Sequence, residues 1–322
     1  MHRLFFIILF SVIGQNLSAL EPSKQQAMYN YTETSDDYIL KSTLLGYESN
    51  RRNLDWPYKD ASAEAIDFGF NFQQQNLELP ANNLQGNRLA FFTAKKFSPF
   101  KYLKIEGAHH NVNSKNNIEE SRTSFLVDFK FKSFKYGDFN FLYSDDYLYQ
   151  QMVLPDGADK YLVGREFSVS HLFTGMEKFR FRTTLKNTNY SDHNKSSYFD
   201  TEAKYHLGQK YQWIWLGFGF NYLEFSDEVI GYWTPEKFLS YGLRFELSSH
   251  TYHNFSVGTG GSLNINQEND QEKGEGHYIN SYLQYGDRND WHLRLEYESI
   301  KSSQENQEWK SDRYSLNITG YL

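Results

Sequence analysis

Several short segments have the residue types of reactive sites. Ser191-Asp192-His193 carries the three side chains of a nucleophilic hydrolase, and the doublets Asp36-Asp37 and Asp145-Asp146 hold acids that could activate a water molecule. A triad needs side chains that converge, whereas neighbouring residues of an extended chain point apart. The polar surroundings of these segments favour turns and strand ends, so the sequence predicts no catalytic residue.

Histidine pairs raise the question of a metal site. His109-His110 would face opposite sides of a strand, and the pair His250 and His253 has no nearby cysteine or ordered set of acids. Gly258-Thr259-Gly260-Gly261 lies inside a strand pattern and opens no helix, so it does not resemble a phosphate-binding loop. We therefore expect no metal and no cofactor.

The elements that position all these residues are alternating strands, and the last residues show this most clearly. Every second residue is apolar or glycine up to the end of the chain: Tyr314, Leu316, Ile318, Gly320 and Leu322. A strand that crosses an outer membrane presents apolar side chains to lipid and polar ones to a watery interior in this way. The pattern predicts a β-barrel with a wet lumen.

The first residues have the features of a secretory signal. Arg3 precedes an apolar core from Leu4 to Ile13, and Leu17-Ser18-Ala19 is a small-residue cleavage site. We expect cleavage after Ala19. The apolar core is shorter than the roughly 20 residues that a membrane-spanning helix needs, so an uncleaved anchor is the weaker alternative.

Composition supports a barrel in the outer membrane. No other stretch is apolar enough for a spanning helix, which excludes an inner-membrane transporter. The chain has 25 Tyr and 27 Phe, residue types that lipid-facing surfaces and interfacial girdles use heavily, and it has no Cys. The formal charge of −7 includes no basic block, so nucleic acid is not an expected partner. Membrane lipid and lipopolysaccharide are expected partners.

The chain reads as one barrel domain. We expect a signal peptide at 1–19, a short periplasmic segment at 20–37 and an antiparallel all-β barrel at 38–322. Fifteen candidate strands cover 38–48, 64–73, 87–97, 101–112, 121–133, 137–147, 162–173, 177–188, 197–207, 211–223, 236–248, 251–265, 276–286, 290–300 and 311–322. Bacterial barrels have even strand numbers, so 16 strands are favoured, with a weak one hidden near 147–154, and 14 come next.

The connectors alternate in length. Tight turns are expected at Ser98-Pro99, Tyr136-Gly137, Gly208-Gln209 and Arg288-Asn289, and these short turns should face the periplasm. Long polar loops are expected at Asn266 to Gly274 and Gln304 to Lys310.

Alternation also assigns the two faces of each strand. The lipid-facing set includes Ile66, Phe68, Phe70, Phe72, Phe125, Val127, Phe129, Phe131, Leu239, Tyr241, Leu243, Phe245, Leu247, Trp291, Leu293, Leu295 and Tyr297. The intervening residues face the lumen and carry both signs of charge: Arg180, Arg182, Asp128, Lys130, Arg244, Glu246, His292, Arg294, Glu296 and Glu298. Interleaved charges suggest either hydrogen bonding to a neutral polar solute or ion pairs that stiffen the wall.

The strand at 211–223 is aromatic on both faces. Trp213 and Trp215 lie on one face, beside Gly217 and Gly219. If this face points inward, the two indoles can stack on sugar rings; the alternative is an interfacial girdle near a strand end.

The segment that follows is the most specific in the chain. It reads Gly231-Tyr232-Trp233-Thr234-Pro235-Glu236-Lys237-Phe238-Leu239-Ser240. This segment resembles one in the carboxy-terminal barrel of the cellulose synthase operon protein C and in exopolysaccharide export porins and barrels of the YaiO type. The resemblance implies a 16-strand pore for a linear polysaccharide. Those exporters carry a helical-repeat domain before the barrel, which this sequence lacks, so a stand-alone barrel of the YaiO type fits better.

Two functions remain open. The first is a passive outer-membrane pore for a polysaccharide or other polar saccharide, with Trp213, Trp215, Arg180, Arg182, Arg244, Glu246, Arg294 and Glu296 lining the passage. The second is a barrel enzyme or surface-binding protein that acts through its extracellular loops. Further expected partners are the barrel insertion machinery, acting on the last strand, and periplasmic synthesis or scaffold proteins.

Overall fold

The computed structural model describes a wall of sixteen strands. The residues that it describes are 23–35, 37–49, 66–78, 83–98, 100–114, 119–133, 135–147, 162–176, 178–207, 214–229, 233–248, 254–286, 291–304 and 307–321. The strands are β1 (Lys24–Thr34), β2 (Ile39–Glu48), β3 (Ile66–Glu78), β4 (Asn83–Ser98), β5 (Lys101–Ser114), β6 (Glu119–Ser133), β7 (Gly137–Tyr147), β8 (Val163–Met176), β9 (Phe179–Tyr190), β10 (Lys195–His206), β11 (Ile214–Phe225), β12 (Lys237–Ser248), β13 (Phe255–Glu268), β14 (Gly274–Gly286), β15 (Trp291–Gln304) and β16 (Gln307–Tyr321). The predicted signal peptide lies outside the described residues.

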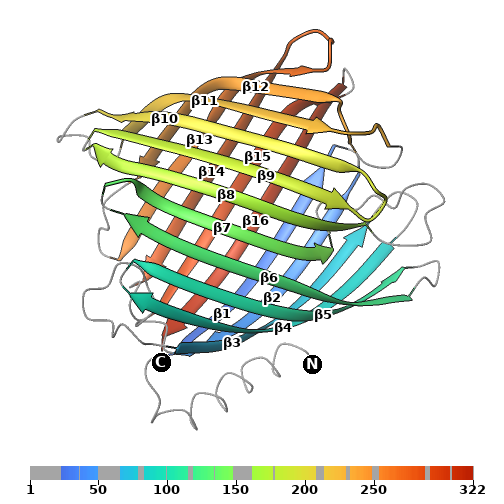
Figure 1. Cartoon of the computed structure of the whole chain (residues 1–322), viewed down its shortest axis with the longest axis vertical. Coiled ribbons are helices and arrows are strands. Elements are labelled where there is room, and N and C mark those ends of the chain that lie inside the picture. Colours follow the sequence, from blue (N-terminus) through green and yellow to red (C-terminus); the bar gives the residue numbers. More distant parts are fainter. Residues whose placement is uncertain are drawn as a thin grey trace.

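The sheet closes on itself. Each strand pairs antiparallel with the next one in the sequence, and β1 pairs with β16 (Figure 1). The closing ladder runs from Lys24 opposite Tyr321 to Thr34 opposite Ser311. Closure pairs the backbone groups that an open edge would leave exposed to lipid. The predicted antiparallel barrel of 16 strands is confirmed. Among the described residues, no helix is long and apolar enough to cross a bilayer.

The strand missing from the sequence prediction is β1, and two predictions are wrong as a result. Residues 24–34 belong to the barrel wall, not to a periplasmic segment at 20–37, and the sixteenth strand is β1 instead of a strand near 147–154, because β7 pairs directly with β8. Residues 148–154 themselves lie outside the described residues. The other fifteen predicted segments correspond to β2–β16. The outward residues of β1 include Gln25 and Glu33 at its ends, and this polar character hides the alternation that marks the other strands.

The register confirms the predicted faces. On β3, Phe68 is 60% exposed on the outside of the isolated chain, whereas the neighbouring Asp67 is fully buried on the inside. Leu243 on β12 and Leu295 on β15 are likewise exposed outward. Because the side-chain period of a strand is two, one such pair determines the facing of the whole strand.

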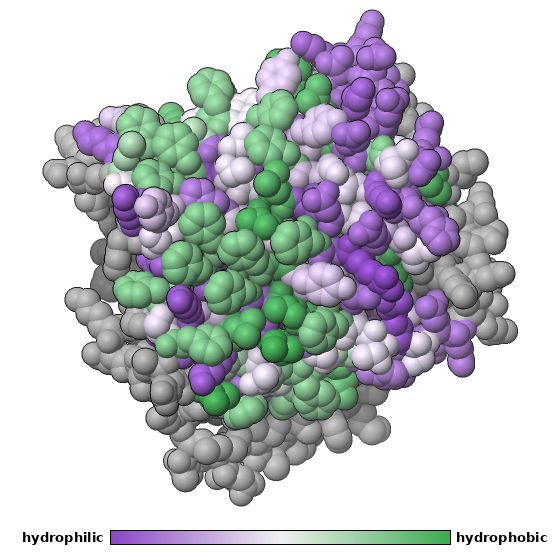
Figure 2. All heavy atoms as spheres, viewed as in Figure 1, coloured by the Kyte–Doolittle hydropathy of each residue, from purple (hydrophilic) through white to green (hydrophobic). Residues whose placement is uncertain are grey.

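The outer surface is apolar over only part of its height. Figure 2 shows apolar side chains gathered toward one edge of the wall and polar ones toward the opposite edge. On β4 the outward residues Leu89, Phe91 and Phe97 lie toward the edge where β1 begins and β16 ends, whereas Asn83 and Gln85 lie toward the other edge. Leu89 to Phe97 spans about 20 Å along the barrel axis for a strand tilted by about 45°, close to the thickness of an outer-membrane apolar band. The polar ends extend beyond it.

The connectors at the two edges differ. The predicted tight turns at Ser98-Pro99, Tyr136-Gly137, Gly208-Gln209 and Arg288-Asn289 fall between strands at the edge where β1 begins and β16 ends. Gly137 has a positive φ of 90°. Glycine adopts this backbone conformation without strain because it has no Cβ. The predicted long loop at Gln304 to Lys310 is wrong, because β15 continues to Gln304 and β16 begins at Gln307. The long segment between β2 and β3 is an exception to short turns at this edge.

Candidate lumen site

A ladder of charged side chains crosses the inner wall from β9 to β12. Arg182 lies directly opposite Glu202, and its guanidinium is 3.4 Å from Glu202 and 3.6 Å from Asp200. The Lys204 ammonium lies 3.1 Å from Glu202 and 3.8 Å from Glu246. Arg180 also pairs with Glu246, although 66 residues separate them in the sequence. Arg180 and Glu246 meet because β9 to β12 lie side by side in the sheet, not because they are close in the sequence.

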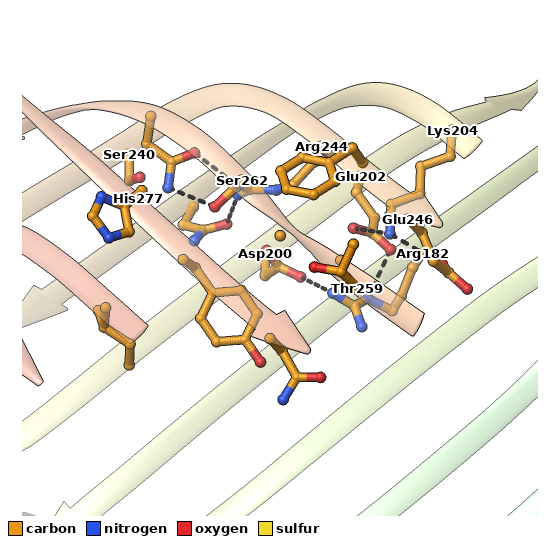
Figure 3. Close-up of a pocket in the computed structure, with 18 of the residues that line it drawn as sticks. Arg182, Asp200, Glu202, Lys204, Ser240, Arg244, Glu246, Thr259, Ser262 and His277 are labelled. Carbon is orange, nitrogen blue, oxygen red and sulfur yellow. Dashed lines mark hydrogen bonds and ion pairs between the residues drawn. The ribbon is translucent and has the colours of Figure 1, made fainter. Parts of the chain in front are cut away.

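All of these side chains except Arg180 line a cavity of about 570 Å³ in the lumen (Figure 3). Its walls come from β10 to β15 and from Arg182 on β9. Tyrosines contribute flat surfaces: Tyr198, Tyr278 and Tyr282 all line the cavity, and the Arg294 guanidinium lies 4.0 Å from the centre of the Tyr282 ring. Arg294 also donates to Glu296 over 2.6 Å. A hydroxyl-rich ring can form hydrogen bonds with the charged groups and can stack on the aromatic faces.

Arg244 differs from the other basic groups of this cavity. It is 8% exposed, and its guanidinium donates to the side-chain oxygens of Asn264, at 2.5 Å, and Asn221, at 3.1 Å. Gly219 makes room for it, because a Cβ at that position would lie 2.3 Å from Arg244 Nε. Figure 3 shows Arg244 beside Ser262 and the acidic groups of β10. Its partners are neutral amides instead of carboxylates.

The structure brings together most of the predicted lumen residues. Arg182, Arg244, Glu246 and Arg294 line the cavity, while Arg180 and Glu296 each contact one of the cavity-lining side chains. Sequence reasoning missed Tyr198, Asp200, Glu202 and Lys204, which alternate along β10. The sequence does contain a signal for them: they alternate with the outward residues Phe199, Thr201, Ala203 and Tyr205, which places all four on the inner face.

The predicted tryptophan surface is placed differently. Trp213 lies outside the described residues. Trp215 is on the inner face, but it is not one of the described residues that line the cavity. Its ring lies 4.7 Å from the Arg180 guanidinium and 4.8 Å from the His206 ring. Part of its surface is thus already covered. The aromatic faces that border the cavity are tyrosines instead.

The motif at 231–240 connects the loop edge of the barrel with the cavity. Gly231 and Tyr232 lie outside the described residues. Trp233 packs edge-on against Phe238 at 5.0 Å and donates from Nε1 to Glu268 over 3.1 Å. Thr234 accepts a hydrogen bond from the Val229 N–H at 2.8 Å, and Pro235 precedes β12 by two residues. The motif thereby positions Phe238 and Ser240, both of which line the cavity.

The other half of the inner wall is packed. Glu106 on β5, 4% exposed, lies 2.5 Å from Arg88 and 2.8 Å from Lys104. Small residues beneath these long side chains, such as Ala90 and Ala108, are almost fully buried. Toward the loop edge, an apolar cluster joins Leu40, Leu77, Leu84, Val112, Tyr147 and Val163, with Tyr38 against it. This region resembles a protein core more than the wall of a channel.

The segments with catalytic composition have structural roles in the fold. Ser191 Oγ accepts the Val163 N–H at 3.0 Å, Asp192 accepts the Asn194 N–H at 3.1 Å, and His193 has a φ of 76°, so this segment forms the β9–β10 turn. Asp145 pairs with Arg122 and Arg165, whereas Asp146 pairs with Arg88 and His110. Asp36, His250 and His253 lie outside the described residues.

One buried group brings together the residue types of a triad without its geometry. His110 Nε2 lies 2.8 Å from Ser124 Oγ and 2.9 Å from Asp146 Oδ1. In a catalytic triad the serine and the acid contact different nitrogens of the imidazole ring. No group of three or more potential metal ligands occurs in the part of the chain that the structure describes.

Comparisons with known proteins give a fold. No family model matches the sequence, and no curated protein matches it. Among solved structures, the chain is similar to "Bacterial polysaccharide outer membrane secretin", with a TM-score of 0.72, 10% sequence identity and coverage of 93% of this chain and 98% of the other. A weaker similarity is to the Pseudomonas aeruginosa protein OpdQ, with a TM-score of 0.47, 9% identity and coverage of 94% and 98%.

The fold and the charged lining of the interior define the class. The chain has the fold of an outer-membrane β-barrel. The resemblance to polysaccharide-export barrels, predicted from the segment at 231–240, is confirmed at the level of this fold.

Proposed function

We propose that the mature chain is a passive pore of the bacterial outer membrane, which it reaches through its signal peptide, and that it conducts a polysaccharide or another polar saccharide. The observation that carries the proposal is the lumen cavity of about 570 Å³, lined by ion pairs and tyrosines. The fold shared with the bacterial polysaccharide outer membrane secretin supports it. The pore would be of the exopolysaccharide-export type.

The chemistry of the wall suits a hydroxyl-rich solute. Paired groups such as Arg182 with Glu202 and Lys204 with Glu246 offer both donors and acceptors at short spacing. Sugar hydroxyls can exchange hydrogen bonds with them in turn, so that no single site holds the chain tightly. Tyr282 and Tyr198 add surfaces on which sugar rings can slide.

An enzyme or loop-acting binding protein is the second candidate, and the geometry favours it less. The Ser191-Asp192-His193 segment is committed to a turn, and the His110 group lacks the two-nitrogen arrangement of a triad. Membrane lipid, lipopolysaccharide, the barrel insertion machinery and periplasmic synthesis or scaffold proteins remain proposed partners.

Single-channel recording tests the proposal. The refolded mature chain, checked for heat-modifiable migration, is placed in a planar bilayer with cello-oligosaccharides or glucosamine oligomers. Stable conductance with concentration-dependent block by at least one saccharide supports the pore. A correctly folded barrel that never conducts contradicts the pore, and conductance that no saccharide blocks contradicts the saccharide cargo.

A further inference from the structure

Charge in the lumen cavity is not balanced evenly. Among the described residues, five basic and three acidic side chains line it: Arg182, Lys204, Arg244, Arg294 and Lys301, against Asp200, Glu202 and Glu246. The three acids already have basic partners within 4.0 Å, namely Arg182 for Asp200, Arg182 and Lys204 for Glu202, and Arg180 and Lys204 for Glu246. None of those partners is Arg244.

The remaining basic groups are engaged as well. Arg294 lies 2.6 Å from Glu296, and Lys301 lies 2.6 Å from Glu308. Of the eight arginines in the described part of the chain, seven contact a carboxylate within 4.0 Å, and Arg244 is the exception. Its guanidinium is held in place by Asn221 and Asn264 and has no described carboxylate within 4.0 Å, and Asp200 and Glu202 attract it only from farther away.

The arrangement around Arg244 leaves capacity for a ligand. A guanidinium has five N–H donors, and the two amide partners take one hydrogen bond each from Nη1 and Nη2. Gly219 lets the side chain lie flat on the wall, where it borders the cavity. Arginine is the residue that best binds a planar acid group through paired hydrogen bonds.

We propose that Arg244 forms a subsite for an acidic substituent on the conducted saccharide, such as the carboxylate of a uronic acid residue. This inference rests on the proposed pore function and specifies its substrate class. A sugar carboxylate would accept hydrogen bonds from Arg244 while the ring of the same or a neighbouring sugar contacts Tyr198 or Tyr282. The subsite makes the lumen selective for acidic over neutral chains.

The test compares block by an oligogalacturonate and by a cello-oligosaccharide of equal length. We expect the acidic chain to block the parent pore at a concentration about tenfold lower, as befits one charge-assisted contact. Arg244→Gln should remove this difference, and Arg244→Lys should keep part of it. Arg165→Gln is the matched control, because Arg165 is an exposed arginine paired with Asp145.

A second variant tests the charge without removing the arginine. Asn221 lies 3.1 Å from Arg244, so Asn221→Asp supplies the missing carboxylate in nearly the same shape. We expect it to abolish the preference for the acidic chain as Arg244→Gln does. Equal block by both chains in the parent, or an unchanged preference in Asn221→Asp and Arg244→Gln, overturns the subsite. Either result leaves the pore intact, whereas absence of conductance or of any block overturns the pore itself.

Discussion

Arg88 on β4 and Arg294 on β15 face the same lumen and pair with glutamates at nearly the same distance, yet their surroundings differ. Glu106, the partner of Arg88, is 5% exposed in its side chain, whereas Glu296, the partner of Arg294, is 29% exposed. The first pair lies within a packed layer with Lys104 and the alanines beneath it. The second lies beside the cavity and the Tyr282 ring.

This difference extends to the two halves of the wall. From β3 to β7 many inward groups pair with one another and an apolar cluster lies at the loop edge, although a smaller cavity of about 260 Å³ borders β6 to β9. From β9 to β15 they border open space. The lumen of a 16-strand barrel must be narrowed if it is to be selective. Here the side chains of one half fill part of the lumen, and those of the other half are free to contact a solute. The passage we propose therefore runs off-centre, along β9–β15.

The largest expected effect comes from breaking the packed half. Glu106→Ala leaves Arg88 and Lys104 without the carboxylate that both contact. Removal of one partner from a buried ion pair costs about 3–5 kcal/mol of unfolding free energy. Urea titration of the barrel in lipid vesicles measures this loss. A decrease below about 1 kcal/mol would show that this region is not packed as the contacts indicate.

The next effect concerns the open half and its aromatic surface. Tyr282→Ala removes an aromatic ring that borders the cavity and that makes a cation–π contact with Arg294. We expect saccharide block of the conductance to weaken about tenfold, the equivalent of about 1.4 kcal/mol. Tyr205→Ala, an outward tyrosine on β10, is the control and should leave block unchanged. Equal effects of the two changes would argue against stacking at Tyr282.

A smaller loss of stability is expected from breaking the more exposed ion pair of the open half. Glu296→Ala breaks a pair whose two side chains are 28% and 29% exposed, so the Arg294 charge stays in contact with water. The unfolding free energy should fall by only about 0.5 kcal/mol, as for partly exposed pairs. The same urea titration used for Glu106→Ala compares the two sites directly. Similar losses at Glu106 and Glu296 would remove the distinction between the halves.

The smallest effect is expected at Trp215. Its ring is already in contact with Arg180 and His206, and it does not itself line the cavity, although it lies directly opposite Glu246, which does. Trp215→Ala should change saccharide block by no more than about twofold, within the range of a peripheral contact. A loss as large as that of Tyr282→Ala would restore the tryptophan as the stacking surface.

Most of the barrel could be predicted from the sequence because each strand carries its own alternation. Residues 66–72 and 314–320 report their facing without any knowledge of their neighbours. β1 could not be found in this way, because Gln25 and Glu33 lie on its outward side. Its place in the wall is determined by pairing with β2 and β16, which is a property of the closed sheet.

The site was predictable in its residue types and not in its geometry. Alternation identifies Arg180, Arg244 and Glu246 as inward residues, but the contact between Arg180 and Glu246 crosses two intervening strands. The neutral partners of Arg244 likewise come from β11 and β13. Which half of the lumen is filled depends on such long-range contacts, so no local pattern indicated it.

Cysteine accessibility tests the off-centre passage most directly. The chain has no cysteine, so a single introduced thiol reports only its own position. Asn280→Cys places a thiol at the cavity, and Ala108→Cys places one in the packed half, where the native residue is 4% exposed. We predict that a charged methanethiosulfonate reagent rapidly lowers the conductance of Asn280→Cys and leaves that of Ala108→Cys unchanged. Equal rates of modification at the two positions, or the reverse order, would contradict the account.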